Sequence, residues 1–162
     1  NIGWADNYNL LVQYFQTYGH CRVVQQRPSS TAVNEDEGSP YDTLIYWVRM
    51  QRQQFRQGKL SPRRISLLNA IQFDWDPQKT NWDKQYQKLK LFYEQNGHTH
   101  VPNSERNKSL YLWTQVQRRT MCKFLNLDNL DPWTRERILK LNTIQFDWKP
   151  SDTMWTEKYQ HL

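Results

Sequence analysis

The chain is 162 residues long and carries 22 Lys and Arg against 16 Asp and Glu, which gives a net charge of +6. Aromatic residues make up 14% of it, including eight tryptophans, whereas glycine occurs only five times. This composition excludes a disordered polar tail and indicates folded, helix-rich domains. No apolar run approaches the roughly 18 residues that cross a bilayer, and two cysteines are too few for a disulfide framework, so we expect an intracellular protein with no membrane partner.

The first predicted helix begins near Trp4 and ends before Gly19. One apolar stripe with the 3.6-residue period of a helix is formed by Trp4, Tyr8, Leu11 and Phe15. Gly19 follows this stripe, where a residue in the left-handed conformation ends many helices. The segment 25–42 comes next and contains Pro, Ser, Gly and an acidic cluster, so we interpret it as a long surface loop.

Two further helices are predicted to complete the first unit. The second spans 43–57 and is ended by Gly58. The third begins at Ser61–Pro62, because a capping residue there precedes a proline at the first helical position. It closes with the pentapeptide IQFDW, whose Ile, Phe and Trp we expect to fill the base of the bundle. The aspartate of this pentapeptide could position an arginine, with Arg64 as the candidate in the first unit and Arg137 in the second.

The same succession then repeats, and IQFDW recurs at 144–148. An offset of 78 residues relates Trp4 to Trp82, one of 66 relates Trp47 to Trp113, and one of 73 relates the two pentapeptides. We therefore expect a helix from Asn81 to before Gly97, a second over 109–124, and a third from Asp131–Pro132. The opening pattern returns once more with Trp155, Tyr159 and Leu162.

These elements predict an all-α fold of two tandem three-helix bundle repeats plus the start of a third. The predicted boundaries are 1–76 for the first repeat, 77–150 for the second, and 151–162 for the first-helix start of the third. No segment alternates apolar and polar residues with period 2, so no strands are expected. A unit of about 70 residues buries a marginal core, and large aromatic side chains enlarge it without any ligand.

The combined pattern resembles the helicase-associated (HA) domain family. In the second repeat the pattern is carried by Trp82, Tyr86, Leu89, Gly97–His98, Val101–Pro102, Leu110, Trp113, Gln117–Arg118, Arg137–Ile138, Leu141, Ile144, Phe146 and Trp148. The first repeat departs from it at Val24, where the pattern has proline, and the second repeat lengthens the turn before its third helix. The resemblance implies a short all-helical module, often in tandem, sometimes attached to a helicase and presumed to bind nucleic acid.

The positive charge concentrates on the second predicted helix of each repeat, where 43–59 and its counterpart contain no acid. On the first of these helices, four basic residues fall within about 80° of arc at roughly 100° per residue. The candidate nucleic-acid-binding residues are Arg49, Arg52, Arg56, Lys59, Arg63, Lys108, Arg118, Arg119 and Lys123. A recurring basic face is typical of phosphate binding, and the alternative is a solvated face whose arginine stems cover apolar surface. Gln51 and Gln117 could read base edges or make local structural hydrogen bonds.

The histidines and cysteines do not form a predicted metal site. His20 and His98 follow the helix-ending glycines, with His100 and Cys21 nearby, but no second cluster supplies the three or four converging ligands that a metal needs. We expect these histidines to cap helix carbonyls or to pack in the interior. No glycine-rich phosphate loop, nucleophile elbow or carboxylate pair with distinguishing spacing is present, so neither enzyme activity nor a cofactor is predicted.

The sequence thus predicts a non-catalytic module that binds DNA or RNA through phosphates, without strong sequence preference. We expect it in the nucleus or another compartment that contains nucleic acid. The alternative is a protein-interaction or scaffold module in a larger assembly, with a helicase or another protein as partner. A third option, with less support, is a unit regulated by metal or redox chemistry through Cys21 and the histidines.

Overall fold

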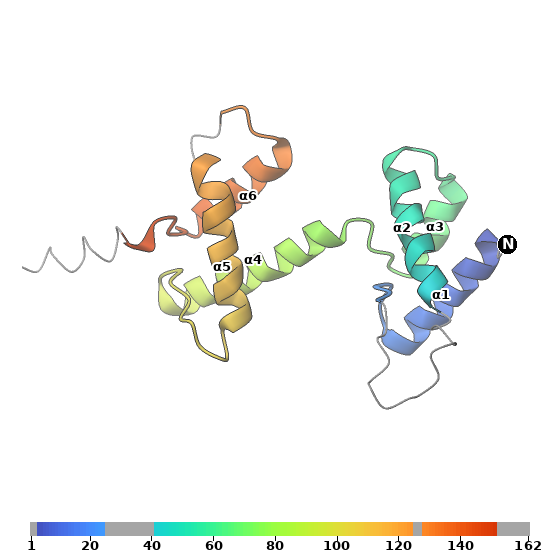
Figure 1. Ribbon diagram of the computed structural model, residues 1–162, viewed down its shortest axis with the longest axis horizontal. Coiled ribbons are helices and arrows are strands. Elements are labelled where there is room, and N and C mark those ends of the chain that lie inside the picture. Colours follow the sequence, from blue (N-terminus) through green and yellow to red (C-terminus); the bar gives the residue numbers. More distant parts are fainter. Residues whose placement is uncertain (1–2, 25–40, 125–127, 152–162) are drawn as a thin grey trace, which may run out of the picture. The chain divides into compact units, whose positions relative to one another are not determined.

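The computed structural model describes residues 3–24, 41–124 and 128–151 (Figure 1). Over these ranges the chain is all-helical and contains no strand, as the sequence predicted. The helices are α1 (Trp4–Tyr18), α2 (Asp42–Arg56), α3 (Pro62–Ala70), α4 (Pro77–Asn96), α5 (Lys108–Met121), a short 3₁₀ helix η1 (Cys122–Phe124), and α6 (Pro132–Thr143). None of the described helices is long and apolar enough to cross a membrane.

The chain divides into two compact units, Asn1–Pro77 and Gln78–Leu162, which we call unit one and unit two. Unit one contains α1, α2 and α3, and unit two contains α4, α5 and α6, so the prediction of two tandem three-helix repeats is confirmed. Residues 25–40 of the predicted loop lie outside the described residues. All but the first residue of the predicted third repeat also lies outside them.

Capping residues end and begin the helices where the sequence predicted. Gly19 takes φ 72° after α1 and donates its N–H to the Phe15 carbonyl. Gly58 takes φ 65° after α2, and the following N–H of Lys59 returns to the Gln54 carbonyl, which closes a Schellman motif. Ser61 and its counterpart Asp131 accept the first backbone hydrogen bonds of α3 and α6 through their side chains.

The start of α4 differs from the prediction. Asn81 was expected to cap this helix, but α4 begins one turn earlier, at Pro77. The Asp76–Pro77 pair has the same acidic-or-polar residue before proline that starts α3 and α6, and a proline suits the first helical position because its missing N–H needs no partner there. Asn81 therefore lies inside the helix.

Each unit buries one leucine from every helix at matching positions. In unit one the completely buried leucines are Leu11, Leu44 and Leu68. In unit two their counterparts Leu89, Leu110 and Leu141 are at most 9% exposed. Around these residues each core is completed by aromatic side chains from the first helix and from IQFDW. The aromatic content of the chain thus fills two small cores.

The IQFDW segments close the third helix of each unit. After α3, Gln72 takes φ 54° and the N–H of Phe73 donates to the Leu68 carbonyl, so the helix ends in a Schellman motif with glutamine in the left-handed position. The Phe73 ring is buried, and the indole N–H of Trp75 donates to the Asn69 side chain. Unit two repeats this arrangement after α6. The structural role expected for IQFDW is confirmed.

Candidate nucleic-acid interface

Arg52 and Arg118, two of the predicted contact residues, are half-buried parts of the fold. They occupy matching positions on α2 and α5. The Nε of Arg52 donates a 2.8 Å hydrogen bond to the backbone carbonyl of Asp74, and the Nε of Arg118 donates one of the same length to Asp147. Each arginine therefore ties the second helix of its unit to the IQFDW segment that ends the third.

The same two guanidinium groups also pack over aromatic rings. Arg52 lies 5.1 Å from the ring centre of Phe73, and Arg118 lies 5.0 Å from that of Phe146. Burial lowers the pKa of both guanidinium groups from its ordinary value, and the nearby aspartate carboxylate opposes this effect. The basic position that recurs between the repeats is therefore explained by packing and hydrogen bonding within each unit.

The aspartates of the two IQFDW segments contact different side chains in the two units. A carboxylate oxygen of Asp74 lies 3.5 Å from a guanidinium nitrogen of Arg22. A carboxylate oxygen of Asp147 lies 2.6 Å from Nε2 of His100. Both partners come from the segment that follows the first helix of the unit, so the aspartate joins that segment to the end of the third helix.

Arg64 and Arg137, the arginines expected beside those aspartates, lie against indole rings. Arg64 is 4.9 Å from the ring centre of Trp4, and Arg137 is 4.8 Å from that of Trp82. The two pairs occupy matching positions in the repeats. A guanidinium placed over an indole is a cation–π arrangement, so the start of each third helix is joined to the first helix of its unit.

Gln51 and Gln117 make structural hydrogen bonds and do not face solvent. Gln51 is 3% exposed and its side-chain oxygen accepts the indole N–H of Trp4 at 3.0 Å. Gln117 is 4% exposed and accepts the indole N–H of Trp82 at 2.9 Å. Of the two roles that the sequence left open, the structure shows the local one. These side chains cannot reach a base edge without leaving the core.

A different surface of α2 and α5 faces away from the core, and we call it the outer stripe. It consists of the exposed residues Tyr46, Arg49, Gln53 and Arg56 on α2 and of Leu112, Gln115 and Arg119 on α5, which are the counterparts of the first three. The predicted contact residues Arg49, Arg56 and Arg119 therefore reach solvent. No described carboxylate forms an ion pair with any of these three.

Four exposed basic residues gather at the turn from α2 into α3, and we call them the basic corner. They are Arg56, Lys59, Arg63 and Arg64. Lys59 was predicted on a helix face, but α2 ends at Arg56, so Lys59 lies in the turn beyond Gly58. The segment 56–64 contains no acidic residue. The positive end of the α3 dipole adds to the field of this corner.

Unit two does not gather its predicted residues in this way. Lys108 is the first residue of α5, whereas Lys123 lies beyond its other end, in η1, with its ammonium 4.9 Å from the Phe124 ring centre. Both are exposed. The basic residues at the start of α6 alternate with Asp131 and Glu136. Of the predicted contact residues, those of unit one are thus the ones that lie close together in one segment.

The histidines after the first helices stabilise local turns. The Nδ1 atoms of His20 and His98 each accept the backbone N–H two residues ahead, at 3.2 Å. Both rings are exposed, so the expected interior packing or helix capping is replaced by this turn contact. Among the described residues, no group of three or more His, Cys, Asp or Glu side chains could hold a metal ion.

Cys21 is buried and protonated near neutral pH. Its thiol lies within 3.2 Å of the Ile71 carbonyl and donates to it. Burial raises the pKa of the Cys21 thiol to about 11, although the charge of Arg52 acts in the opposite direction. A reactive cysteine must be exposed to solvent and ionised, whereas Cys21 is buried and protonated. The geometry therefore offers no support for redox regulation through Cys21.

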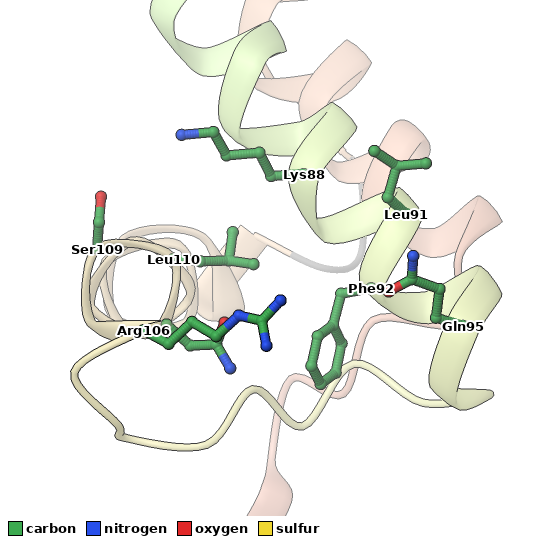
Figure 2. A pocket seen from close by; sticks show the side chains of 8 residues that line it. Lys88, Leu91, Phe92, Gln95, Arg106, Ser109 and Leu110 are labelled. Carbon is green, nitrogen blue, oxygen red and sulfur yellow. The ribbon is translucent and has the colours of Figure 1, made fainter.

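Two cavities are lined in part by basic residues, and neither cavity was predicted from the sequence. In unit one a cavity of about 330 Å³ lies between α1 and the start of α3, beside the basic corner. In unit two a cavity of about 380 Å³ lies between α4 and the start of α5, with Lys88 and Arg106 among its lining residues (Figure 2). Figure 2 shows the Arg106 side chain pointing toward Phe92 from the segment that precedes α5.

Comparison with known proteins identifies one family. The model of the family described as "Helicase associated domain" matches the chain twice, over residues 2–76 and 79–149. The two matches cover nearly the whole chain and follow its two repeats. Neither the comparison with curated proteins nor that with solved structures gives a significant match.

Proposed function

Because the chain belongs to the helicase-associated domain family, we propose that it is a non-catalytic module that binds DNA or RNA through the phosphate backbone. The proposal includes no strong sequence preference, because the two glutamines that could have read base edges are buried. It also places the protein inside the cell, in a compartment that contains nucleic acid.

The observation that carries this proposal is the local group of exposed cations on α2 and at the turn into α3 of unit one. The basic corner and Arg49 of the outer stripe present exposed cations for which no described carboxylate serves as an ion-pair partner. Cations left in solvent without acidic neighbours create a positive potential that attracts phosphates, and their binding releases the counterions of the nucleic acid.

The structure also revises which residues a test should change. Arg52 and Arg118 hold the IQFDW segments, so replacing them would disturb the fold and confuse loss of binding with loss of structure. The informative residues of unit one are Arg49, Arg56, Lys59 and Arg63, all of which are exposed. In unit two the corresponding set is Lys108, Arg119 and Lys123.

The test is a titration of short single- and double-stranded DNA and RNA by fluorescence anisotropy over a salt series. Phosphate binding predicts a linear fall of log K with log salt concentration. The Arg49→Ala/Arg56→Ala double variant should show a slope shallower by about 1.4–1.8, since each lost phosphate contact removes about 0.7–0.9 from it.

A matched control removes the same charge from another surface. Lys84→Ala/Lys90→Ala changes two exposed lysines of α4 and should leave the slope close to that of the wild type. If both double variants reduce the slope equally, net charge alone drives binding and the proposed surface is wrong. If none of the four nucleic acids binds at low salt, the nucleic-acid proposal itself fails.

A second candidate function is protein interaction. The outer stripe places Tyr46 and Leu112 at matching positions, and these side chains are 67% and 52% exposed. A large hydrophobic side chain exposed to solvent at the same position in two repeats suits contact with a protein, such as a helicase or another partner. Absence of nucleic-acid binding at low salt, together with loss of a partner complex in Tyr46→Ser, would favour this alternative.

A further inference from the structure

The cavity in unit one and a much smaller one in unit two occupy matching places. Trp4, Arg63, Arg64 and Leu67 line the first. Their counterparts in the repeat line the second, namely Trp82, Glu136, Arg137 and Lys140. The first has a volume of about 330 Å³ and the second one of about 10 Å³. The two repeats therefore share one site, which is open in unit one and filled in unit two.

Trp133 contributes to filling the site in unit two. The guanidinium of Arg137 lies 3.1 Å from the ring centre of Trp133 and 4.8 Å from that of Trp82, so it contacts two indoles. This arrangement leaves Arg137 only 9% exposed. A planar aromatic group stacked on a guanidinium is thus an occupant that this site accepts within the same chain.

Unit one lacks the residue that would do the same. Arg137 is the sixth residue of α6, whereas its counterpart Arg64 is the third residue of α3, because α6 is three residues longer at its start. Trp133 lies in this additional turn. Arg64 still lies over the indole of Trp4 at 4.9 Å, but it is exposed, and the cavity opens beside it.

The charge of the site also differs between the units. In unit two Lys79 and Lys140 form ion pairs with Asp83 and Glu136 at 3.0–3.8 Å, so two carboxylates offset two of the three cations that line the site. In unit one the positions of Asp83 and Glu136 hold Ala5 and Arg63. The described residues lining the open cavity include two arginines and no carboxylate.

We propose that the open site of unit one binds one nucleotide of a single-stranded nucleic acid, with its base stacked on Arg64 where Trp133 lies in unit two. Its phosphate then contacts Arg63 and the start of α3. Bases in single strands stack on arginine planes as well as on aromatic rings, and every base has a face that can do so. This inference rests on the proposed nucleic-acid binding and adds a base contact to a phosphate surface.

The test compares a short oligothymidylate with an abasic oligomer that has the same number of phosphates. We expect the wild-type chain to bind the base-bearing strand about tenfold more tightly, since stacking one base on a side chain gives an effect of this order. Arg64→Lys keeps the charge and removes the stacking plane, and Ala5→Trp fills the cavity without changing the charge. In both variants the ratio of the affinities for the two strands should fall toward one. The slope of log K against log salt concentration should stay as in the wild type.

The outcomes separate this inference from the function it rests on. Equal binding of both strands by the wild-type chain, with a normal salt slope, overturns the nucleotide site and leaves phosphate binding in place. An unchanged preference in both variants also overturns it. No binding of either strand at low salt refutes both proposals. Binding of an acidic peptide that contains tryptophan, without binding of the oligothymidylate, assigns the cavity to a protein side chain instead. Melting curves of both variants identify any loss of folding.

Discussion

Replacing Arg118 with methionine is expected to destabilise unit two far more than replacing its neighbour Arg119. Methionine keeps an unbranched apolar side chain but cannot donate to the Asp147 carbonyl, which accepts at 2.8 Å. A hydrogen bond from a charged donor contributes about 1.5–3 kcal/mol, and the guanidinium over Phe146 adds about 0.5–2 kcal/mol. Because these contributions overlap, we expect a total loss of about 2–4 kcal/mol.

The loss is large for a unit of this size. For a domain of 60–100 residues, 1 kcal/mol shifts the melting temperature by about 4–8 °C, so the transition of unit two should fall by roughly 10–25 °C. Thermal and urea unfolding of the full chain by circular dichroism measures this shift, and hydrogen exchange of the α5 and α6 amides assigns it to unit two.

Arg119→Met is the matched control, because it removes the same charge from the adjacent, exposed residue. Its effect on the free energy of unfolding should stay within about 0.5 kcal/mol. Equal stability of the two variants would refute the structural role of Arg118. If Arg118→Met then weakened nucleic-acid binding at unchanged stability, Arg118 would return to the interface set.

Three further predictions concern buried and strained positions. Gln117→Leu should cost about 1–3 kcal/mol in urea unfolding, because it leaves the indole N–H of Trp82 without its acceptor; a cost below about 0.5 kcal/mol would contradict this role. Gly97→Ala should cost about 1 kcal/mol through backbone strain alone, since φ is 73° and no atom lies near the added methyl; an unchanged melting temperature would show that this strain is absent. The Cys21 pKa of about 11 exceeds the ordinary value of 9, so the unfolded thiol ionises first and stability falls as pH rises from about 9 to 11. The difference in unfolding free energy between wild type and Cys21→Ala should change by up to about 2–3 kcal/mol over this range, and a constant difference would argue against a buried thiol.

The helices and their ends could be predicted because the interactions that define them are local. Gly19 and Gly58 act on carbonyls within the preceding turns, and Ser61 accepts an N–H three residues ahead. Such signals are complete within a few residues of sequence. The start of α4 was missed because the apolar stripe that begins at Trp82 favoured Asn81 as the cap, although Asp76–Pro77 carries the same start signal as the two third helices.

The candidate site was predicted less well, because exposure depends on residues distant in the sequence. A helical wheel placed Arg52 beside Arg49 and Arg56, but Arg52 contacts a carbonyl 22 residues away and is half buried. Gln51 was open to two interpretations until Trp4, 47 residues away, was seen to donate to it. One feature of the sequence could have indicated the open cavity of unit one. The interval from Pro62 to Arg64 at the start of α3 is shorter than the interval from Pro132 to Arg137 at the start of α6.

The sequence by itself determined the number of repeats, the helical class and most helix ends, since each depends on periodic or neighbouring residues. Only the tertiary structure decided which basic residues are available to a ligand. It assigned the recurring arginine of the second helices to the fold, because that side chain reaches the IQFDW carbonyl. It showed that the basic corner is exposed to solvent. It also showed that α3 lacks one helical turn, so the site that Trp133 helps to fill in unit two is open in unit one.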